Sequence, residues 1–252
     1  MITIDLSGKA AVVTGGSAGI GRAITHTLLR AGAHVTVLAR DAYRDEADDL
    51  YSGSCIDFVE LDITDSRRVS AVYADLARQR GIDIAVHSAG TLAGGALAET
   101  SDEQWRNLMA VNLDGAFFCS REAIRHMLDS GNGGKVVLIG SVSGLVGNPG
   151  FAAYCASKAA LINLTRQAAV DYAALGINVN SVLPGFVTTR MTERYDERTK
   201  EYLAAQTPTG TWAAPQDIAD AVLFLCSALS DHVHGHNLVV DGGLTAGTPL
   251  NL

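Results

Sequence analysis

Aromatic residues are scarce in this chain. They make up only 6% of the 252 residues, whereas hydrophobic residues of all kinds make up 48% and glycines number 26. Small aliphatic side chains must therefore fill the core, which suits close packing of helices on a sheet better than a β-sandwich. A chain of this length can bury a sizeable core within one domain.

Positive charge is also in short supply. The chain has 19 Lys and Arg against 27 Asp and Glu, which gives a formal net charge of −8. This balance argues against nucleic acid, and against an anionic membrane, as the main partner. The acidic cluster from Asp41 to Asp49 is interrupted by Arg44, so we interpret it as the solvated face of a helix.

Cysteines and long apolar runs are few. Cys55, Cys119, Cys155 and Cys226 are scattered without a CxxC pair, which excludes the usual patterns of disulfide frameworks and zinc sites. No apolar run reaches the roughly 18 residues that a membrane-spanning helix needs. The first residues also lack the basic and then apolar pattern of a signal peptide. We therefore expect a soluble, cytoplasmic protein.

Apolar runs alternate with helical patterns along the whole chain. The expected strands are 9–14, 34–39, 55–61, 82–87, 135–140, 177–183 and 237–241, and the expected helices are about 22–31, 67–80, 101–128, 154–175 and 215–227. The third of these helices opens on Ser101-Asp-Glu-Gln104, which has the form of a capping box. The alternation, with no linker or repeat, predicts one α/β domain over residues 1–252, built on a doubly wound parallel sheet with helices on both faces.

Residues 186–214 break this regular pattern, and we call them the lid segment. They follow the carboxyl end of an expected strand, which is the edge where doubly wound sheets bind their ligands. We therefore expect the lid segment to be a mobile cover over the substrate.

A glycine-rich turn joins the first expected strand to the first helix. Its glycines are Gly15, Gly19 and Gly21, with Ser17 and Ile20 between them. Glycines there allow a tight turn and close backbone approach, and the helix N-terminus offers free N–H groups to a pyrophosphate. The position of this turn predicts a dinucleotide site.

The residues at the end of the second expected strand indicate whether the dinucleotide is NAD or NADP. A carboxylate there holds the ribose 2′-hydroxyl of NAD, whereas an arginine can pair with the 2′-phosphate of NADP. This chain has Ala39 and then Arg40, with no carboxylate before Asp41. Arg40 can form a charge-assisted pair with a phosphate, so we predict NADP(H) rather than NAD(H).

Three residues form a candidate proton-transfer group. Tyr154 and Lys158 are four apart and share one face of a helix. A nearby ammonium lowers the pKa of a phenol, so we expect Lys158 to bring Tyr154 toward the working range of an acid or base. Ser141 follows a buried strand and can donate a hydrogen bond to a substrate oxygen. The alternative is a tyrosine that simply packs beside a lysine stem.

These motifs, with Asn112 and Pro184-Gly185 in the same order and spacing, together resemble the short-chain dehydrogenase/reductase family from about residue 6 to 243. The resemblance implies a single-domain Rossmann fold that assembles as a tetramer or dimer. It implies that Tyr154 exchanges a proton with the substrate, that Lys158 lowers its pKa and binds the nicotinamide ribose, and that Ser141 orients the substrate oxygen. Asn112 would hold a water in the proton relay.

The resemblance also implies a set of cofactor contacts. Thr188 matches a threonine that binds the carboxamide, and Asp62 matches an acid that contacts the adenine, although Asp62 is equally suited to cap the helix that follows. His87 stands where the family usually has an asparagine that stabilises the sheet. The full set of expected contacts is Gly15, Ser17, Gly19, Ile20, Gly21, Arg40, Asp62, Ile63, Ala89, Gly90, Tyr154, Lys158, Pro184, Gly185, Val187 and Thr188.

His232, His234 and His236 alternate, so on an extended segment they could face one way toward a metal. No cysteine or carboxylate stands at a supporting spacing, and imidazoles alone seldom specify a metal. We expect a turn there and no metal site.

The expected reaction is reversible hydride transfer between NADP(H) and a small-molecule carbonyl or secondary alcohol. The expected pocket residues are mostly apolar, and no arginine is evident for a substrate carboxylate, which favours a neutral or hydrophobic substrate. These residues are Leu92, Val142, Leu145, Phe151, Phe186 and Met191.

Three alternatives stay open. A 3-oxoacyl-[acyl-carrier-protein] reductase is disfavoured because residues 128–133 and 171–176, which should flank the cleft, lack Lys and Arg for an acidic carrier. A sugar or polyol dehydrogenase stays open because the lid sequences of that subgroup vary too much to exclude it. A non-catalytic dinucleotide-binding protein would belong to a different class.

Overall fold

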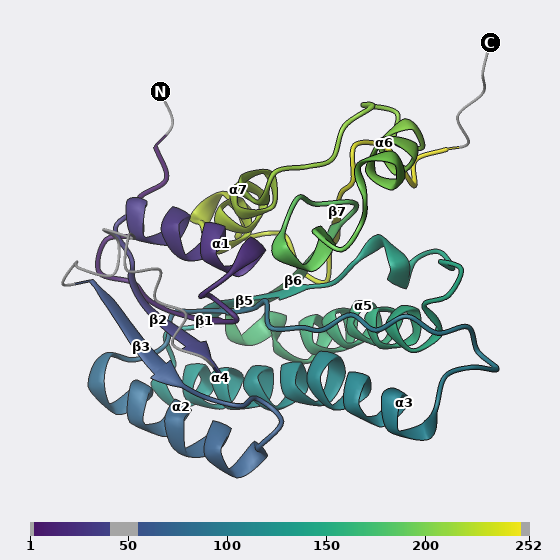
Figure 1. Cartoon of the computed structure of the whole chain (residues 1–252). Helices are drawn as coiled ribbons and strands as arrows, with labels where there is room; N and C mark the ends of the chain where they lie inside the picture. Colours follow the sequence, from purple (N-terminus) through teal and green to yellow (C-terminus); the bar gives the residue numbers. More distant parts are fainter. Residues whose placement is uncertain (1–2, 41–54, 248–252) are drawn as a thin grey trace.

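The computed structural model describes residues 3–40 and 55–247. The acidic cluster and Asp41 lie outside the described residues. Within them, one parallel sheet of seven strands runs through the molecule in the order β3-β2-β1-β4-β5-β6-β7 (Figure 1). The strands are β1 (Ala10–Thr14), β2 (His34–Ala39), β3 (Ile56–Glu60), β4 (Ile84–His87), β5 (Gly134–Ile139), β6 (Ile177–Pro184) and β7 (Asn237–Val240). The predicted α/β class is confirmed.

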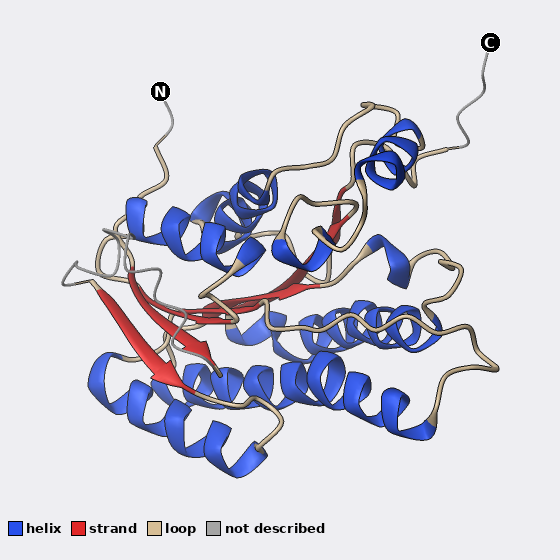
Figure 2. Cartoon of the chain, in the orientation of Figure 1, coloured by secondary structure: helices blue, strands red, loops and turns tan. Residues whose placement is uncertain are grey.

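Helices cover both faces of the sheet, as Figure 2 shows. On one face lie α1 (Gly19–Arg30) and α7 (Pro215–Cys226), and on the other lie α2 (Ser66–Arg80), α4 (Ala116–Ser130) and α5 (Ala152–Tyr172). Neighbouring strand residues point to opposite faces, so Val12 joins the core under α4 while Val13 joins the core under α1. Burial on both faces explains why the strands read as continuous apolar runs.

The helix predicted over 101–128 is divided into three parts. It begins as α3 (Asp102–Met109), widens into a π-helical segment, η2 (Ala110–Gly115), and continues as α4 to Ser130. The capping box is confirmed, because Gln104 N donates to Ser101 Oγ over 3.1 Å and Ser101 N donates to Gln104 Oε1 over 3.0 Å. Uniform apolar periodicity hid the π segment, which often marks a functional site.

Three other predicted boundaries shift. The first helix begins at Gly19 rather than Arg22, because Gly19 and Gly21 belong to the glycine-rich turn and to the first helical turn at once. Pro184 is the last residue of β6, so the strand ends after the proline rather than before it. The helix predicted to end near Leu175 ends as α5 at Tyr172, and a 3-10 turn over Ala173–Leu175 leads to Gly176 at a φ of 74°.

The lid segment contains regular structure of its own. A 3-10 turn, η5 (Arg190–Thr192), is followed by α6 (Glu197–Ala205). Both ends of the lid segment are tied together, since Ala213 N donates to Phe186 O over 2.9 Å and Thr188 N donates to Ala213 O over 3.0 Å. This pairing places η5 and α6 beyond the carboxyl ends of β6 and β7 (Figure 1).

Among residues 3–40 and 55–247, no helix combines the length and the apolar character needed to cross a membrane.

Candidate active site

The glycine-rich turn lies at the carboxyl end of β1, against the end of β4. Gly15 has a φ of 67°, and a Cβ on it would lie 2.8 Å from the main chain of Ala89. A Cβ on Gly21 would lie 2.1 Å from Gly15 O. Neither position can carry a side chain, so the tight turn between β1 and α1 requires glycine at both.

The N-terminus of α1 points its N–H groups at this turn. Ala18, the residue that precedes α1, provides no side-chain cap. The first N–H groups of the helix are therefore left for an anion, as a pyrophosphate site requires. A Cβ on Gly19 would lie 3.5 Å from Thr189 of the lid segment, so the lid segment closes over the same turn.

Arg40 and Asp62 lie close together at the carboxyl ends of β2 and β3. Arg40 is exposed, and its charge helps to lower the pKa of Asp62, although the main cause is the hydrogen bond that Asp62 accepts from the main chain of Thr64. Asp62 does not cap α2, because Asp65 accepts the hydrogen bonds of Arg67 N and Arg68 N. The alternative interpretation of Asp62 as the helix cap is therefore wrong.

Ser141, Tyr154 and Lys158 converge at the carboxyl end of β5. Lys158 Nζ donates to Ile139 O over 2.9 Å and lies 5.6 Å from the centroid of the Tyr154 ring. Ser141 is buried just after β5, and its Oγ accepts a hydrogen bond from Ser143 N over 3.1 Å. The Ser141 hydroxyl thus keeps its own proton to donate.

Burial governs the pKa values of this group. It raises the pKa of Tyr154 above its usual value, while a hydrogen bond with Ser141 acts in the opposite direction. It also lowers the pKa of Lys158 to about 8. Desolvation of the phenol is the larger effect in the chain alone, and the lowering of the Tyr154 pKa by Lys158 stays a prediction.

The side-chain amide of Asn112 is hydrogen-bonded within the protein and does not face a substrate. Its Oδ1 accepts from Thr91 N over 2.8 Å, and its Nδ2 donates to Thr91 O over 2.9 Å and to Ser157 Oγ over 3.3 Å. A Cβ on Gly90 would lie 3.4 Å from Asn112 Oδ1 and 3.8 Å from Lys158 Nζ. The π-helical segment around Asn112 thus packs directly against the site.

The remaining sequence-predicted cofactor residues surround the same edge of the sheet. Ile63 is buried against the π-helical segment, since a Cβ on Gly115 would lie 2.6 Å from Ile63 Cδ1. Gly185 has no room for a Cβ beside Asp241, and Val187 is buried next to it in sequence. Thr188 is exposed and lines a cavity of about 230 Å³ within the lid segment, together with Trp212.

One arginine that the sequence did not point to reaches the site. The guanidinium carbon of Arg194 lies 5.7 Å from the centroid of the Phe151 ring and 5.2 Å from that of Tyr195. Tyr195 also packs edge-on against Trp212, with 6.2 Å between ring centroids. Phe151 is far from Arg194 in sequence, so only the fold reveals this contact.

His87, the departure from the usual asparagine, is buried on β4. Neither ring nitrogen has a hydrogen-bond partner in the described part of the chain, and burial lowers the pKa of His87 to about 3. The imidazole is therefore neutral at physiological pH.

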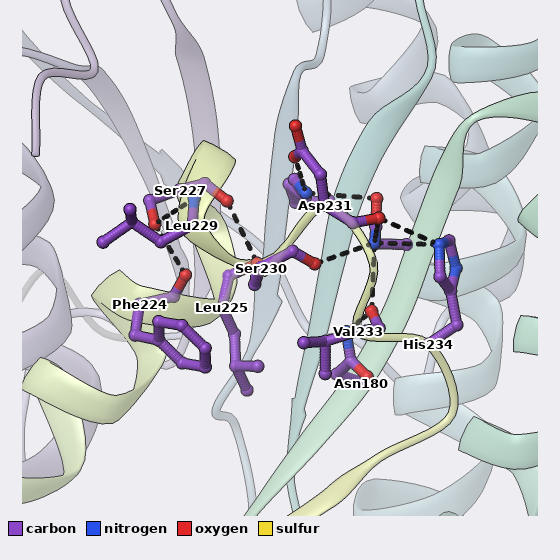
Figure 3. A network of polar contacts seen from close by, with 11 residues as sticks. Asn180, Phe224, Leu225, Ser227, Leu229, Ser230, Asp231, Val233 and His234 are labelled. Carbon is purple, nitrogen blue, oxygen red and sulfur yellow. Dashed lines mark hydrogen bonds and ion pairs between the residues drawn. The ribbon is translucent and has the colours of Figure 1, made fainter.

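The three alternating histidines lie on the turn before β7. Asn180 Nδ2 donates to Val233 O over 2.8 Å, and His234 Nε2 lies 3.2 Å from Asp231 O (Figure 3). Within residues 3–40 and 55–247, no group of three or more His, Cys, Asp or Glu residues is arranged to hold a metal ion.

Comparisons with known proteins agree with this geometry. A profile of the family described as "Enoyl-(Acyl carrier protein) reductase" matches residues 15–245. The chain is 37% identical over 243 residues to a 3-oxoacyl-[acyl-carrier-protein] reductase of Rickettsia bellii, covering 96% of this chain and 98% of that protein. It is 38% identical over 249 residues to gluconate 5-dehydrogenase of Gluconobacter oxydans, covering 96% of each chain.

Solved structures are equally similar. A putative NAD(P)-dependent gluconate 5-dehydrogenase from Beutenbergia cavernae, solved with bound NADP, is 38% identical with a TM-score of 0.92, covering 98% of this chain and 100% of that one. A gluconate 5-dehydrogenase from Burkholderia cenocepacia, in complex with NADP and tartrate, is 33% identical with a TM-score of 0.91 and covers 98% of each chain. The chain belongs to the short-chain dehydrogenase/reductase family, and it is an NAD(P)-dependent oxidoreductase that acts on CH–OH groups.

Proposed function

We propose that this enzyme uses NADPH to reduce the carbonyl of a small molecule to a secondary alcohol, reversibly, with Tyr154 as the general acid and base. The observation that supports this most strongly is the convergence of Ser141, Tyr154 and Lys158 beside Gly90. Tyr154 and Lys158 come from α5 and Ser141 from the end of β5, and together they offer a proton, a charge and a hydrogen-bond donor to one point.

A dinucleotide fits the residues of the site. Gly15 and Gly21 allow the tight turn, the uncapped start of α1 leaves N–H groups for a pyrophosphate, and Gly90 places no side chain beside Lys158. When bound there, the nicotinamide would exchange a hydride with the substrate carbon.

The side chains of the site then manage the proton. In reduction, the Tyr154 hydroxyl gives its proton to the substrate oxygen while the Ser141 hydroxyl donates a hydrogen bond to that oxygen. A pKa of about 8 leaves Lys158 mostly protonated near neutral pH, so its charge can stabilise the phenolate left behind. In oxidation the same phenolate takes the proton back. The side chain of Asn112 is already engaged, so Asn112 would hold a relay water through its main chain.

Arg40 supports the preference for NADPH. It is exposed at the carboxyl end of β2, near the part of the fold that receives the adenosine in doubly wound sheets. A phosphate on the ribose would meet this guanidinium, which forms bidentate pairs with phosphate oxygens.

Two substrate classes compete. A 3-oxoacyl-[acyl-carrier-protein] reductase is supported by relatives of that name, but the last turns of α4 and α5 carry no basic residue to dock an acidic carrier. A sugar-acid or polyol dehydrogenase is supported by relatives named gluconate 5-dehydrogenase, and it needs no such docking surface.

The test is oxidation of NADPH by the purified protein with ketones, diketones, quinones, keto sugars, keto sugar acids and 3-oxoacyl thioesters, each repeated with NADH. We expect one chemical class to be reduced, with NADPH preferred. Thioesters should be offered both on acyl carrier protein and on a small thiol. A strong preference for the carrier-bound form would favour the first class.

We also propose a cytoplasmic homo-oligomer, a tetramer or a dimer. Apolar side chains are exposed on the outer helices, with Phe117 of α4 at 41% and Val170 of α5 at 81% exposure. Burying them against a second copy would remove this surface from water. Light scattering during size-exclusion chromatography tests the state.

A further inference from the structure

The guanidinium of Arg194, in the lid segment, lies beside two aromatic rings and forms no ion pair with the described residues. Its guanidinium carbon lies near the rings of Phe151 and Tyr195, and its Nη2 lies 3.3 Å from the Tyr195 hydroxyl oxygen. A guanidinium has five N–H donors in a planar fork, so most of the donors of Arg194 are uncommitted. Contact with the two rings restricts the side chain in advance, which reduces the entropy lost on binding.

The acids near Arg194 are engaged elsewhere. Asp196 caps α6 by accepting from Thr199 N over 2.7 Å, and Glu197 pairs with Lys200 over 2.7 Å. Glu193 and Glu201 line the cavity beside Trp212, which neither Phe151 nor Tyr154 lines. No ion pair of Arg194 is present among residues 3–40 and 55–247. Its charge is thus available to a ligand.

This charge is close to the candidate proton donor. Phe151 immediately precedes α5, and Tyr154 stands three residues later, in the first turn of that helix. Tyr195 is near enough to Tyr154 to contribute to the raised pKa of that phenol. We therefore expect a ligand whose oxygen meets Tyr154 to reach Arg194 with a further chain of a few carbons.

We propose that Arg194 binds the carboxylate of the substrate, which makes this enzyme a reductase of oxo acids whose keto group is a few carbons from the acid. The proposal rests on the proposed carbonyl reduction and names its substrate class. A carboxylate presents two oxygens in a plane, which match one edge of the stacked fork. A phosphate dianion is less suitable, because Arg194 is a single charge with Glu193 beside it in the chain. The expectation of a neutral substrate assumed that no arginine reaches the cleft, and Arg194 removes that assumption.

The kinetic test uses matched probes. Levulinate is an oxo acid, methyl levulinate is its neutral ester, and dihydroxyacetone phosphate supplies a phosphate in place of the carboxylate. Wild type should reduce levulinate with the highest kcat/KM of the three. In Arg194→Gln, we expect kcat/KM for levulinate to fall by about 10- to 100-fold, mainly through KM, and that for the ester to change by less than about threefold.

Two further variants separate charge from structure. Arg194→Lys keeps the charge but not the planar fork, so it should recover part of the loss. Arg198→Gln removes an exposed arginine from α6, four residues further along the lid segment, and should leave both substrates unaffected. Equal losses on levulinate and its ester in Arg194→Gln would overturn the proposal, and so would no loss on either or a preference for dihydroxyacetone phosphate.

A binding measurement keeps this test independent of turnover. The chain has two tryptophans, so Trp105→Phe leaves Trp212, which contacts Tyr195, as the sole reporter. With NADP⁺ present, levulinate cannot be reduced, and we expect it to change the Trp212 fluorescence with an affinity that falls at least tenfold in Arg194→Gln. That result in a protein that reduces no carbonyl would uphold carboxylate binding by Arg194 while refuting the proposed reduction. Failure of wild type to bind levulinate would overturn the inference itself.

Discussion

Lys158 Nζ donates a hydrogen bond of 2.9 Å to the main-chain carbonyl of Ile139. The bond joins α5 to the carboxyl end of β5. It therefore fixes the position of the helix that carries Tyr154 relative to the strand that leads to Ser141. Lys158 is thus both a buried charge near the phenol and a structural tie.

This burial predicts a pH dependence of stability. The pKa of Lys158 is lowered from 10.5 to about 8, so between these values the unfolded chain binds more protons than the native one. Native stability therefore rises with pH across that window, and the penalty is present in full below about pH 8. Relative to Lys158→Met, wild type should gain up to about 3 kcal/mol between pH 7 and 10.5, as measured by urea unfolding. A constant difference between the two proteins would show that Lys158 is not desolvated.

His87 should make the protein sensitive to acid. Its pKa is lowered from 6.5 to about 3 by burial, so stability is lost as the pH falls below 6.5 and the unfolded chain gains a proton that the native chain excludes. At pH 5 this loss is about 2 kcal/mol relative to neutral pH. His87→Asn should lose less stability than wild type over the same range in urea unfolding. Identical acid profiles would contradict a neutral, sequestered imidazole.

Gly15 and Gly8 offer a matched pair for testing the glycine-rich turn. Both have positive φ values, 67° and 79°, but a Cβ on Gly15 would meet Ala89 at 2.8 Å, whereas Gly8 has nothing within 4 Å. Gly8→Ala should lose only about 1 kcal/mol of stability through backbone strain and should bind NADPH normally. Gly15→Ala should lose more stability and bind NADPH at least tenfold more weakly. Equal binding in calorimetry would place the pyrophosphate elsewhere.

Arg40 should determine the cofactor preference. Arg40→Ala removes the proposed partner of the 2′-phosphate, so the KM for NADPH should rise by about 10- to 100-fold, since a charged hydrogen bond is involved. The KM for NADH serves as the internal control and should stay within about threefold. A variant that keeps the wild-type ratio of the two KM values would refute the assignment.

The sequence predicted most of the fold because the strands are continuous apolar runs and the helices have clear ends. Burial on both faces of the sheet produces such runs, and residues such as Gly32 and Gly176 punctuate them. The π-helical segment around Asn112 escaped prediction because its apolar spacing is that of an α-helix, and the tie from Asn112 to Thr91 is tertiary.

The sequence predicted only those features of the candidate site that follow from local spacing, and not those that depend on tertiary contacts. Tyr154 and Lys158 are related by helical spacing, which a sequence displays. The raised pKa of Tyr154 depends on burial, and the contact of Arg194 with Phe151 depends on how the lid segment folds back. Neither leaves a local pattern in the chain.

The most direct test of the proposed reaction is NADPH turnover and NADPH binding measured side by side in Tyr154→Phe. This change removes one oxygen from a half-buried ring, so the fold and the cofactor affinity should stay close to wild type. We expect kcat with the best carbonyl substrate to fall by at least about 1000-fold, because general acid catalysis contributes on the order of 10² to 10⁴. Turnover near the wild-type rate, with NADPH bound normally, would show that another group supplies the proton.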